Sequence, residues 1–240
     1  MSRGFYGRRG RIGLIVPSSN TTMETDYNRL APEGVSVHTA RISFRGASST
    51  DELAALLKHV NDAVEVLLDC RPNVVVWGCT AASIVPGLED EVERIIEVNQ
   101  GVHCVMPLKA AVSGFKALGV TRVSLAAPYT KEILEGVRMY LERSGLSVVA
   151  VKGLGLSDNH IIAEQPPQTI YQLVSSVNLK EAEGIFISCT NLRVLDIIEE
   201  LERDLGKIVV SSNQAGLWAA LKKIGVNEHI FGYGKLLALK

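Results

Sequence analysis

The chain contains an internal repeat, and this repeat constrains its fold more than any other feature of the sequence. The apolar segment Val74–Thr80 ends in Gly-Cys-Thr, and Gly184–Thr190, in the second half of the chain, ends in Ser-Cys-Thr. Leu14–Asn20 is echoed in the same way by Ser124–Thr130, in the same order and at nearly the same spacing. These two correspondences predict two similar structural units related by a pseudo-twofold axis.

Short apolar runs alternate with segments of helical periodicity along the whole chain. Continuous valine and isoleucine runs between amphipathic helices are typical of parallel strands that helices cover on both faces. The sequence therefore predicts an α/β protein with two lobes, each a four-stranded parallel sheet flanked by helices, and an active-site cleft between them. The expected strands are Gly13–Pro17, Val35–Ile42, Val74–Gly78, His103–Val105, Val123–Ala126, Val148–Lys152, Gly184–Ser188 and Lys207–Ser211. The expected helices are Asp51–Asp69, Val92–Asn99, Leu108–Leu118, Ile133–Ser144, Pro167–Val177, Leu195–Leu205 and Ala215–Ile224.

The two lobes are expected to divide the chain near its middle. The first lobe is predicted at residues 10–112 and the second at residues 113–212, while the C-terminal segment 213–240 is expected to return to the first lobe. No linker rich in proline or glycine lies at the boundary, which predicts closely packed lobes that do not swing freely.

Composition excludes several classes of protein. Hydrophobic residues make up 47% and charged residues 21% of the chain, which is too apolar for a disordered protein. A net charge of −1 offers no basic surface to nucleic acid or to a membrane. No apolar run approaches the ~20 residues of a membrane helix, and no signal core follows the basic first residues. We expect a cytoplasmic protein without a nucleic-acid or membrane partner, and a homo-oligomer (a dimer or higher) as the commonest state.

The familiar signatures of cofactor and metal sites are absent from the sequence. There is no phosphate-binding loop, no complete dinucleotide fingerprint around Gly153–Gly155 and no Gly-x-Ser-x-Gly elbow. The histidines are scattered and the cysteines lack zinc-like spacing, so we expect neither a cofactor nor a metal. A surface role explains His160 better than a place in the cleft, and Arg193 suits an ion pair as well as a carboxylate clamp.

The chemistry is expected at the carboxyl ends of the strands. Ligands of open parallel sheets bind beyond these ends, and here the residues that follow the strands are rich in Ser, Thr, Asn and Cys. A pseudo-twofold axis would place Cys79 and Cys189 on opposite walls of one cleft. The segments concerned are Pro17–Thr22, Cys79–Ala82, Pro107, Pro128–Thr130, Cys189–Arg193 and Ser211–Gln214.

Cys79 and Cys189 each end a strand and are each expected to open a helix. The free N–H groups and partial positive charge of a helix N-terminus lower the pKa of a thiol and hold a substrate carboxylate. A single strand-end cysteine is more simply explained as a small buried apolar residue, but two at equivalent positions of a repeat favour a function. Cys70, at the end of a helix, and Cys104, within a strand, are expected to be structural.

Several segments of the chain together resemble one known family. Gly13–Glu24, with its Pro-Ser-Ser-Asn-Thr-Thr-Met-Glu, resembles the opening of maleate cis–trans isomerases. The resemblance covers nearly the whole chain and extends to the wider aspartate/glutamate racemase superfamily, which includes hydantoin racemases and arylmalonate decarboxylases. It implies a two-lobed fold in which cysteines face each other across a cleft. The other segments that fit the family in order are Gly78–Thr80, Ala127–Tyr129, Asp158–Asn159, Ser188–Arg193 and Ser211–Ala215.

The resemblance also implies a reaction and roles for individual residues. It implies a cofactor-independent isomerase that converts maleate, a small dicarboxylate, to fumarate. Cys79 matches the thiolate that adds to one double-bond carbon, and Cys189 matches the proton donor to the other. Arylmalonate decarboxylases carry glycine at the first of these positions, which disfavours decarboxylation here. Asn20, Tyr129 and Asn159 match side chains that hold the two carboxylates, and further substrate contacts are expected from Ser18, Ser19, Thr80 and Thr190.

Other interpretations of these residues stay open at this point. Asn20 could serve only as the N-cap of a helix from Thr21, Tyr129 could be a packing residue, and Asn159 could serve only its own turn. Two facing cysteines also suit a racemase of an amino acid or a hydantoin. An arylmalonate-decarboxylase-like enzyme is a further alternative, and a two-lobed protein that binds small acids without turnover is the alternative outside the enzymes.

Overall fold

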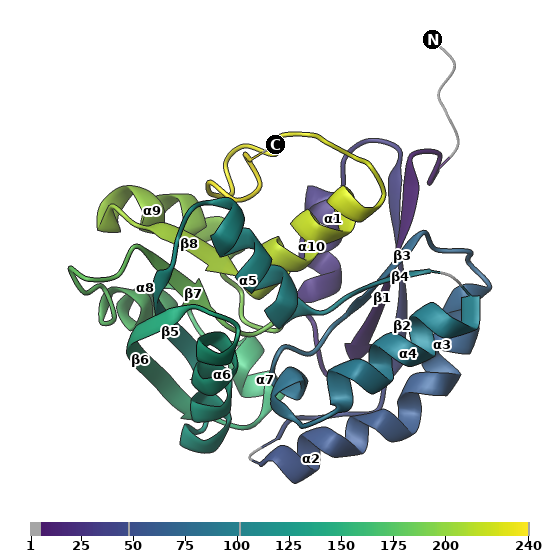
Figure 1. Cartoon of the computed structure of the whole chain (residues 1–240), viewed down its shortest axis with the longest axis horizontal. Helices are drawn as coiled ribbons and strands as arrows, with labels where there is room; N and C mark the ends of the chain where they lie inside the picture. Colours follow the sequence, from purple (N-terminus) through teal and green to yellow (C-terminus); the bar gives the residue numbers. More distant parts are fainter. Residues whose placement is uncertain (1–5, 48, 101, 240) are drawn as a thin grey trace.

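Two parallel sheets form the framework of the protein (Figure 1). The computed structural model describes residues 6–47, 49–100 and 102–239. The first sheet has the strand order β2-β1-β3-β4 and the second the order β6-β5-β7-β8, so both halves are wound in the same way. Each predicted strand is present, and the predicted fold class is confirmed. The strands are β1 (Gly10–Pro17), β2 (Val35–Ile42), β3 (Val74–Trp77), β4 (His103–Val105), β5 (Arg122–Tyr129), β6 (Ser147–Leu156), β7 (Gly184–Ile187) and β8 (Ile208–Ser211).

The helices that flank the sheets are largely those expected from the sequence. The expected helix Asp51–Asp69 is divided, because the 3-10 helix η1 separates α2 from α3. The list of expected helices lacks α1, which entered only as the helix from Thr21 that Asn20 could cap, and the very short α7. The helices are α1 (Met23–Leu30), α2 (Thr50–Ala54), η1 (Ala55–His59), α3 (Val60–Leu68), η2 (Ala81–Ile84), α4 (Leu88–Gln100), α5 (Pro107–Ala117), α6 (Lys131–Arg143), α7 (Asn159–Ala163), α8 (Pro167–Ser175), η3 (Leu195–Ile197), α9 (Ile198–Leu205) and α10 (Ser212–Lys223).

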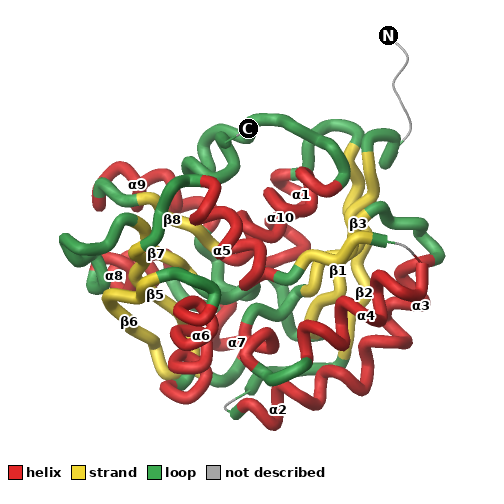
Figure 2. The backbone as a smooth tube through the Cα atoms, in the orientation of Figure 1, coloured by secondary structure: helices red, strands yellow, loops and turns green. Residues whose placement is uncertain are grey.

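The central strands of both sheets are buried on both faces. Every residue of β3 and β7 is buried, and β1 and β5 are nearly as buried. The edge strands β2 and β6 are mostly half-buried. Helices lie on either side of the strands (Figure 2), which is the covering that parallel sheets require. All residues of β3 and β7 are apolar, and the polar residues of these two segments follow the strand ends.

The two halves interlock through the last helix of each. α5 follows β4 of the first sheet but packs against β8 of the second, while α10 follows β8 but packs against β3 and β4. The two helices also pack against each other at the centre of the molecule (Figure 1). Phe115 of α5 meets Phe186 of β7 edge to face, with ring centroids 6.3 Å apart. The division at residues 112 and 113 falls within α5, and these lobe boundaries stay a prediction.

The segment after α10 contacts both halves of the molecule. Glu228 forms an ion pair with Arg9, just before β1, at 2.5 Å, and other contacts reach the second half. The buried carboxylate of Glu202 accepts the N–H groups of Val209 at 3.0 Å and Lys235 at 2.9 Å. The side-chain amide of Gln214 donates to the carbonyl of Tyr233. In the part of the chain that the structure describes, no helix is both long enough and apolar enough to cross a bilayer.

Candidate active site

A small pocket lies where the carboxyl ends of the two sheets face each other. Its volume is about 30 Å³. Both halves of the chain line it, as the repeat predicts for a cleft. Its polar lining residues are Asn20, Cys79, Thr80, Tyr129, Ser157, Asn159, Cys189, Thr190 and Asn191, and its apolar lining residues are Pro17, Phe44, Ala47, Leu53, Ala81, Ile133, Leu156 and Ile162.

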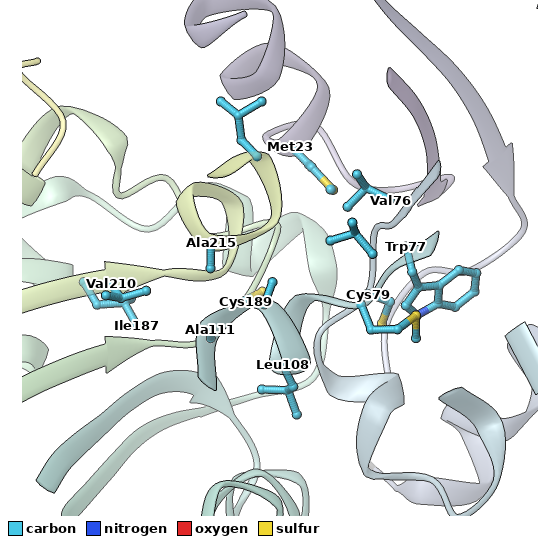
Figure 3. Packing of buried hydrophobic residues seen from close by; sticks show 14 of the residues in the cluster. Met23, Val76, Trp77, Cys79, Leu108, Ala111, Ile187, Cys189, Val210 and Ala215 are labelled. Carbon is cyan, nitrogen blue, oxygen red and sulfur yellow. The ribbon is translucent and has the colours of Figure 1, made fainter. Parts of the chain in front are cut away.

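Both cysteines singled out by the repeat lie in this pocket. Cys79 comes two residues after the end of β3, and Cys189 two residues after the end of β7. Figure 3 shows them on the two sides of the junction between the halves, with Cys79 beside Trp77. Cys79 is 8% exposed and Cys189 is 7% exposed, so both residues are buried at the edge of the pocket.

The prediction that each cysteine opens a helix holds only in part. The short 3-10 helix η2, with Thr80 as its N-cap, follows Cys79, whereas Cys189 is followed by a turn that precedes η3. Neither cysteine precedes an α-helix directly, so individual N–H groups are the donors. The N–H of Asn191 donates to the Cys189 sulfur at 3.3 Å, and two N–H groups of η2 face the Cys79 sulfur.

Burial dominates the acidity of both thiols. It raises the pKa of Cys79 to about 12, which two backbone N–H groups offset only in part and which charge on Cys189 raises further. Burial raises the pKa of Cys189 less, to about 11, because the Asn191 N–H and the Tyr129 hydroxyl stabilise its thiolate. The expectation that local fields lower the thiol pKa values is therefore wrong, because burial raises the pKa of both thiols.

The two threonines that follow the cysteines have different surroundings. The Thr190 hydroxyl donates to the carbonyl of Gly78 at 2.7 Å and accepts from the amide of Asn20 at 3.1 Å, so it ties the two cysteine turns together. The Thr80 hydroxyl is buried and has no hydrogen-bond partner among the described residues. Since a buried hydroxyl without a partner is unfavourable, Thr80 is the one of the two that is free to bind a ligand.

Asn20 both caps a helix and lines the pocket. Its side-chain oxygen accepts the N–H groups of Thr22 and Met23, each at 3.0 Å, at the start of α1. The alternative role as a helix cap is therefore present. The amide nitrogen of the same side chain points across the junction to Thr190, and the residue lines the pocket. Capping fixes the orientation of this amide.

Asn159 lines the pocket, whereas the two predicted serines do not. The side-chain amide of Asn159 donates to the hydroxyl of Ser19 at 2.9 Å. The backbone carbonyl of Asn159 accepts the side-chain amide of Asn191 at 2.8 Å. The hydroxyls of Ser18 and Ser19 both donate to the carbonyl of Phe44. Neither serine lines the pocket, so their hydroxyls hold the pocket wall and do not face its interior.

The remaining candidates are separated from the pocket, and the sequence missed several lining residues. His160 and Arg193 are exposed and do not line it. Asn191, directly after the second Cys-Thr pair, lay in a predicted segment but was not singled out. The apolar wall formed by Phe44, Ala47 and Leu53 was missed.

The described residues include no group of three or more His, Cys, Asp or Glu side chains that could hold a metal ion.

A buried carboxyl group lies behind the Cys189 turn. Asp26 of α1 is 5% exposed and accepts the side-chain amide of Asn213 at 2.8 Å. Burial raises the pKa of Asp26 from 3.8 to about 6, although the Asn213 hydrogen bond and the charge of Arg29 lower it. Above that pH the folded protein holds a buried charge that the unfolded chain holds in water.

The substitution Asp26→Asn is expected to stabilise the protein, and to do so more at neutral pH than at acid pH. The pKa of Asp26 is higher in the folded protein than in the unfolded chain. The unchanged protein therefore has its full stability from this group below about pH 4 and loses it as the pH rises through 6, where Asp26 ionises. The gain in unfolding free energy should be larger at pH 7.5 than at pH 4 by about 2 kcal/mol. Urea unfolding of both proteins at the two pH values measures it. Equal gains would contradict the raised pKa.

Comparisons with known proteins agree with this geometry. The arylmalonate decarboxylase family model matches residues 12–237. The maleate isomerase of Nocardia farcinica is 30% identical over 239 residues, 95% of either chain. The arylmalonate decarboxylase of Bordetella bronchiseptica is 29% identical over 230 residues, which cover 94% of this chain and 95% of that protein. A solved cysteine-to-serine variant of the Nocardia farcinica maleate cis-trans isomerase, with a covalently bound succinylcysteine intermediate, has a TM-score of 0.90 at 28% identity and covers 96% of this chain and 99% of its own.

Proposed function

The chain belongs to the arylmalonate decarboxylase family, and on that premise we propose that it is a cofactor-independent cis–trans isomerase that converts maleate to fumarate with Cys79 and Cys189. One observation carries the proposal: the two thiols, from equivalent positions of the repeat, line the same small pocket. The decarboxylase alternative is less well supported because, by resemblance, those enzymes have glycine at the position of Cys79. The covalent succinylcysteine in a relative supports thiol addition to a four-carbon dicarboxylate.

The reaction requires the pair of thiols to carry one proton. Burial raises the pKa of both thiols, and the order of the two values does not assign the roles. The resemblance assigns them: Cys79 adds as the thiolate, and Cys189 keeps its proton. A pair is needed because one residue must attack without its proton while the other supplies one.

Addition makes the double bond single and so permits rotation. The Cys79 thiolate attacks one alkene carbon, and the electron pair of the double bond moves to the other carbon and into its carboxylate. The Cys189 thiol then protonates that carbon, which gives a succinyl thioether in which the central bond rotates. After rotation the Cys189 thiolate removes the proton, the C–S bond breaks and fumarate leaves. Both thiols return to their starting states.

The charge that develops on the carboxylate must be met by hydrogen-bond donors. Thr80, whose hydroxyl has no other partner among the described residues, is proposed to donate to it. Tyr129, 6% exposed and beside the Cys189 sulfur, is proposed to donate to the second carboxylate, with Asn20 and Asn159 along the same wall. Preorganised neutral donors in a pocket largely closed to water stabilise such charge strongly.

Maleate supplied to the purified protein is expected to give fumarate. Proton NMR follows the rate and identifies the product, because the vinyl protons of maleate and fumarate have different chemical shifts. Iodoacetamide pretreatment of the pocket thiols should abolish the conversion, and maleate should protect against it. The control is the Cys70→Ser protein, because Cys70 is exposed and outside the pocket and its loss should not change the rate.

Other outcomes of the same assay would replace the proposal. Deuterium incorporation at the alpha carbon of an amino acid or a hydantoin, without fumarate, would indicate a racemase. Release of carbon dioxide from an arylmalonate would indicate a decarboxylase. Saturable binding of maleate without turnover and without thiol protection would indicate a binding protein.

A further inference from the structure

The first turn of α10 holds the backbone on both sides of Cys189. The N–H of Cys189 donates to the hydroxyl of Ser212 at 3.1 Å, and the side-chain amide of Asn213 donates to the carbonyl of Thr190 at 3.0 Å. Figure 3 shows the start of α10, marked by Ala215, beside Cys189. The catalytic turn is therefore clamped from the helix that follows β8.

This clamp opposes backbone strain. Cys189 has a φ of 154°, a value that residues with a side chain rarely adopt. Such a conformation costs of order 1–3 kcal/mol and persists only when the surroundings fix it. Its consequence here is geometric, because it turns the Cys189 sulfur toward the N–H of Asn191 and into the pocket.

Asp26 is the second acceptor of the Asn213 amide. The amide nitrogen carries two hydrogens, of which one goes to Thr190 and the other to the carboxylate of Asp26 at 2.8 Å. The amide oxygen of Asn213 has no partner among the described residues. Without Asp26, only the hydrogen bond to the Thr190 carbonyl would hold this side chain in its orientation.

We propose that Asp26 is a positioning residue for Cys189: it orients the Asn213 amide that grips the Thr190 carbonyl and so keeps the strained turn in place. Asp26 does not line the pocket and does not touch the substrate. The inference rests on the proposed function only in giving Cys189 a part in catalysis. Loss of Asp26 lets the turn relax and draws the Asn191 N–H away from the sulfur.

The test compares Asp26→Leu, Asp26→Asn and Glu202→Gln with the unchanged protein. Asp26→Leu removes the acceptor, Asp26→Asn keeps a weaker neutral one, and Glu202→Gln is the matched control. Glu202 is also a buried carboxylate with two hydrogen bonds, but its partners are Val209 and Lys235. Alkylation of Cys189 and Cys79 by iodoacetamide is followed separately by mass spectrometry between pH 7 and 11. This readout does not depend on the substrate, so it stands even if maleate is not converted.

At each of these pH values the rate of Cys189 alkylation follows its thiolate fraction, so the rate should fall about threefold or more in Asp26→Leu and by less in Asp26→Asn, because the thiolate loses an N–H donor. Glu202→Gln should match the unchanged protein. With maleate, kcat should fall about 10- to 100-fold in Asp26→Leu while KM changes less than about threefold. An unchanged Cys189 profile in the Asp26 variants, or an equal shift in Glu202→Gln, would overturn the proposal. If Asp26→Leu does not fold, the Asp26→Asn profile decides.

Discussion

Replacing either Cys79 or Cys189 by serine is expected to lower kcat at least about a thousandfold, because each removes one half of an addition and protonation pair. A serine hydroxyl is far less acidic than a thiol and a poor nucleophile at neutral pH. The two variants should nevertheless differ. Cys189→Ser keeps the adding thiol and should accumulate a succinyl adduct on Cys79, whereas Cys79→Ser should form none. Steady-state rates and intact-protein mass spectrometry measure the two effects.

The matched control is Cys104→Ser. Cys104 is as buried as the pocket cysteines and lies near the sulfur of Met106, at 3.9 Å, but it does not line the pocket. Its replacement should change stability more than turnover, with kcat within about twofold of the unchanged protein. Conversion of maleate by Cys79→Ser at the unchanged rate would exclude addition by that residue, and an adduct on the sulfur of Cys189 would reverse the assigned roles.

The strands, the two-lobed fold class and the place of the pocket could be predicted because they depend on local patterns and on the repeat. Continuous apolar runs such as Val74–Gly78 identify buried parallel strands, and the repeated Gly/Ser-Cys-Thr motif places both thiols at strand ends. Asn20, Tyr129 and Thr80 follow from the same rule, since each lies at or just beyond the end of a buried strand. All of them line the pocket.

What the sequence could not supply depends on contacts between distant segments. Phe44 joins the pocket wall because the chain after β2 crosses to the other half, where Gly46 pairs with Asp158. Gly46 has no room for a side chain there, because a Cβ at this position would lie 2.1 Å from the Ser157 carbonyl oxygen. The acidity of the thiols was misjudged because burial outweighs the few N–H groups that reach them. The link from Asp26 through Asn213 joins α1 to α10, which no local pattern connects.

The substitution Gly78→Ala is expected to destabilise the protein by about 3 kcal/mol or more and to abolish turnover. A Cβ at Gly78 would lie 2.6 Å from the carbonyl oxygen of Ile15 and 2.9 Å from the Cα of Val16. Both atoms belong to the backbone of the central strand β1 and cannot give way as a flexible side chain would. The same Ile15 carbonyl accepts the N–H of Gly78 at 2.7 Å. Urea unfolding and the maleate assay measure the two losses.

Gly114→Ala is the control, since its Cβ would meet only the flexible end of Leu236, at 3.1 Å, and alanine favours a helix interior over glycine. It should leave both stability and turnover nearly unchanged.

The equivalent position of the repeat, Ser188, accommodates a side chain, so the requirement for glycine is specific to the first half. There the Gly78 carbonyl accepts the Thr190 hydroxyl, and displacement of Gly78 would move Cys79 and release the link between the two cysteine turns together. A Gly78→Ala protein of unchanged stability and activity would mean that the close approach of β1 to the Cys79 turn is not needed to hold the thiol in place.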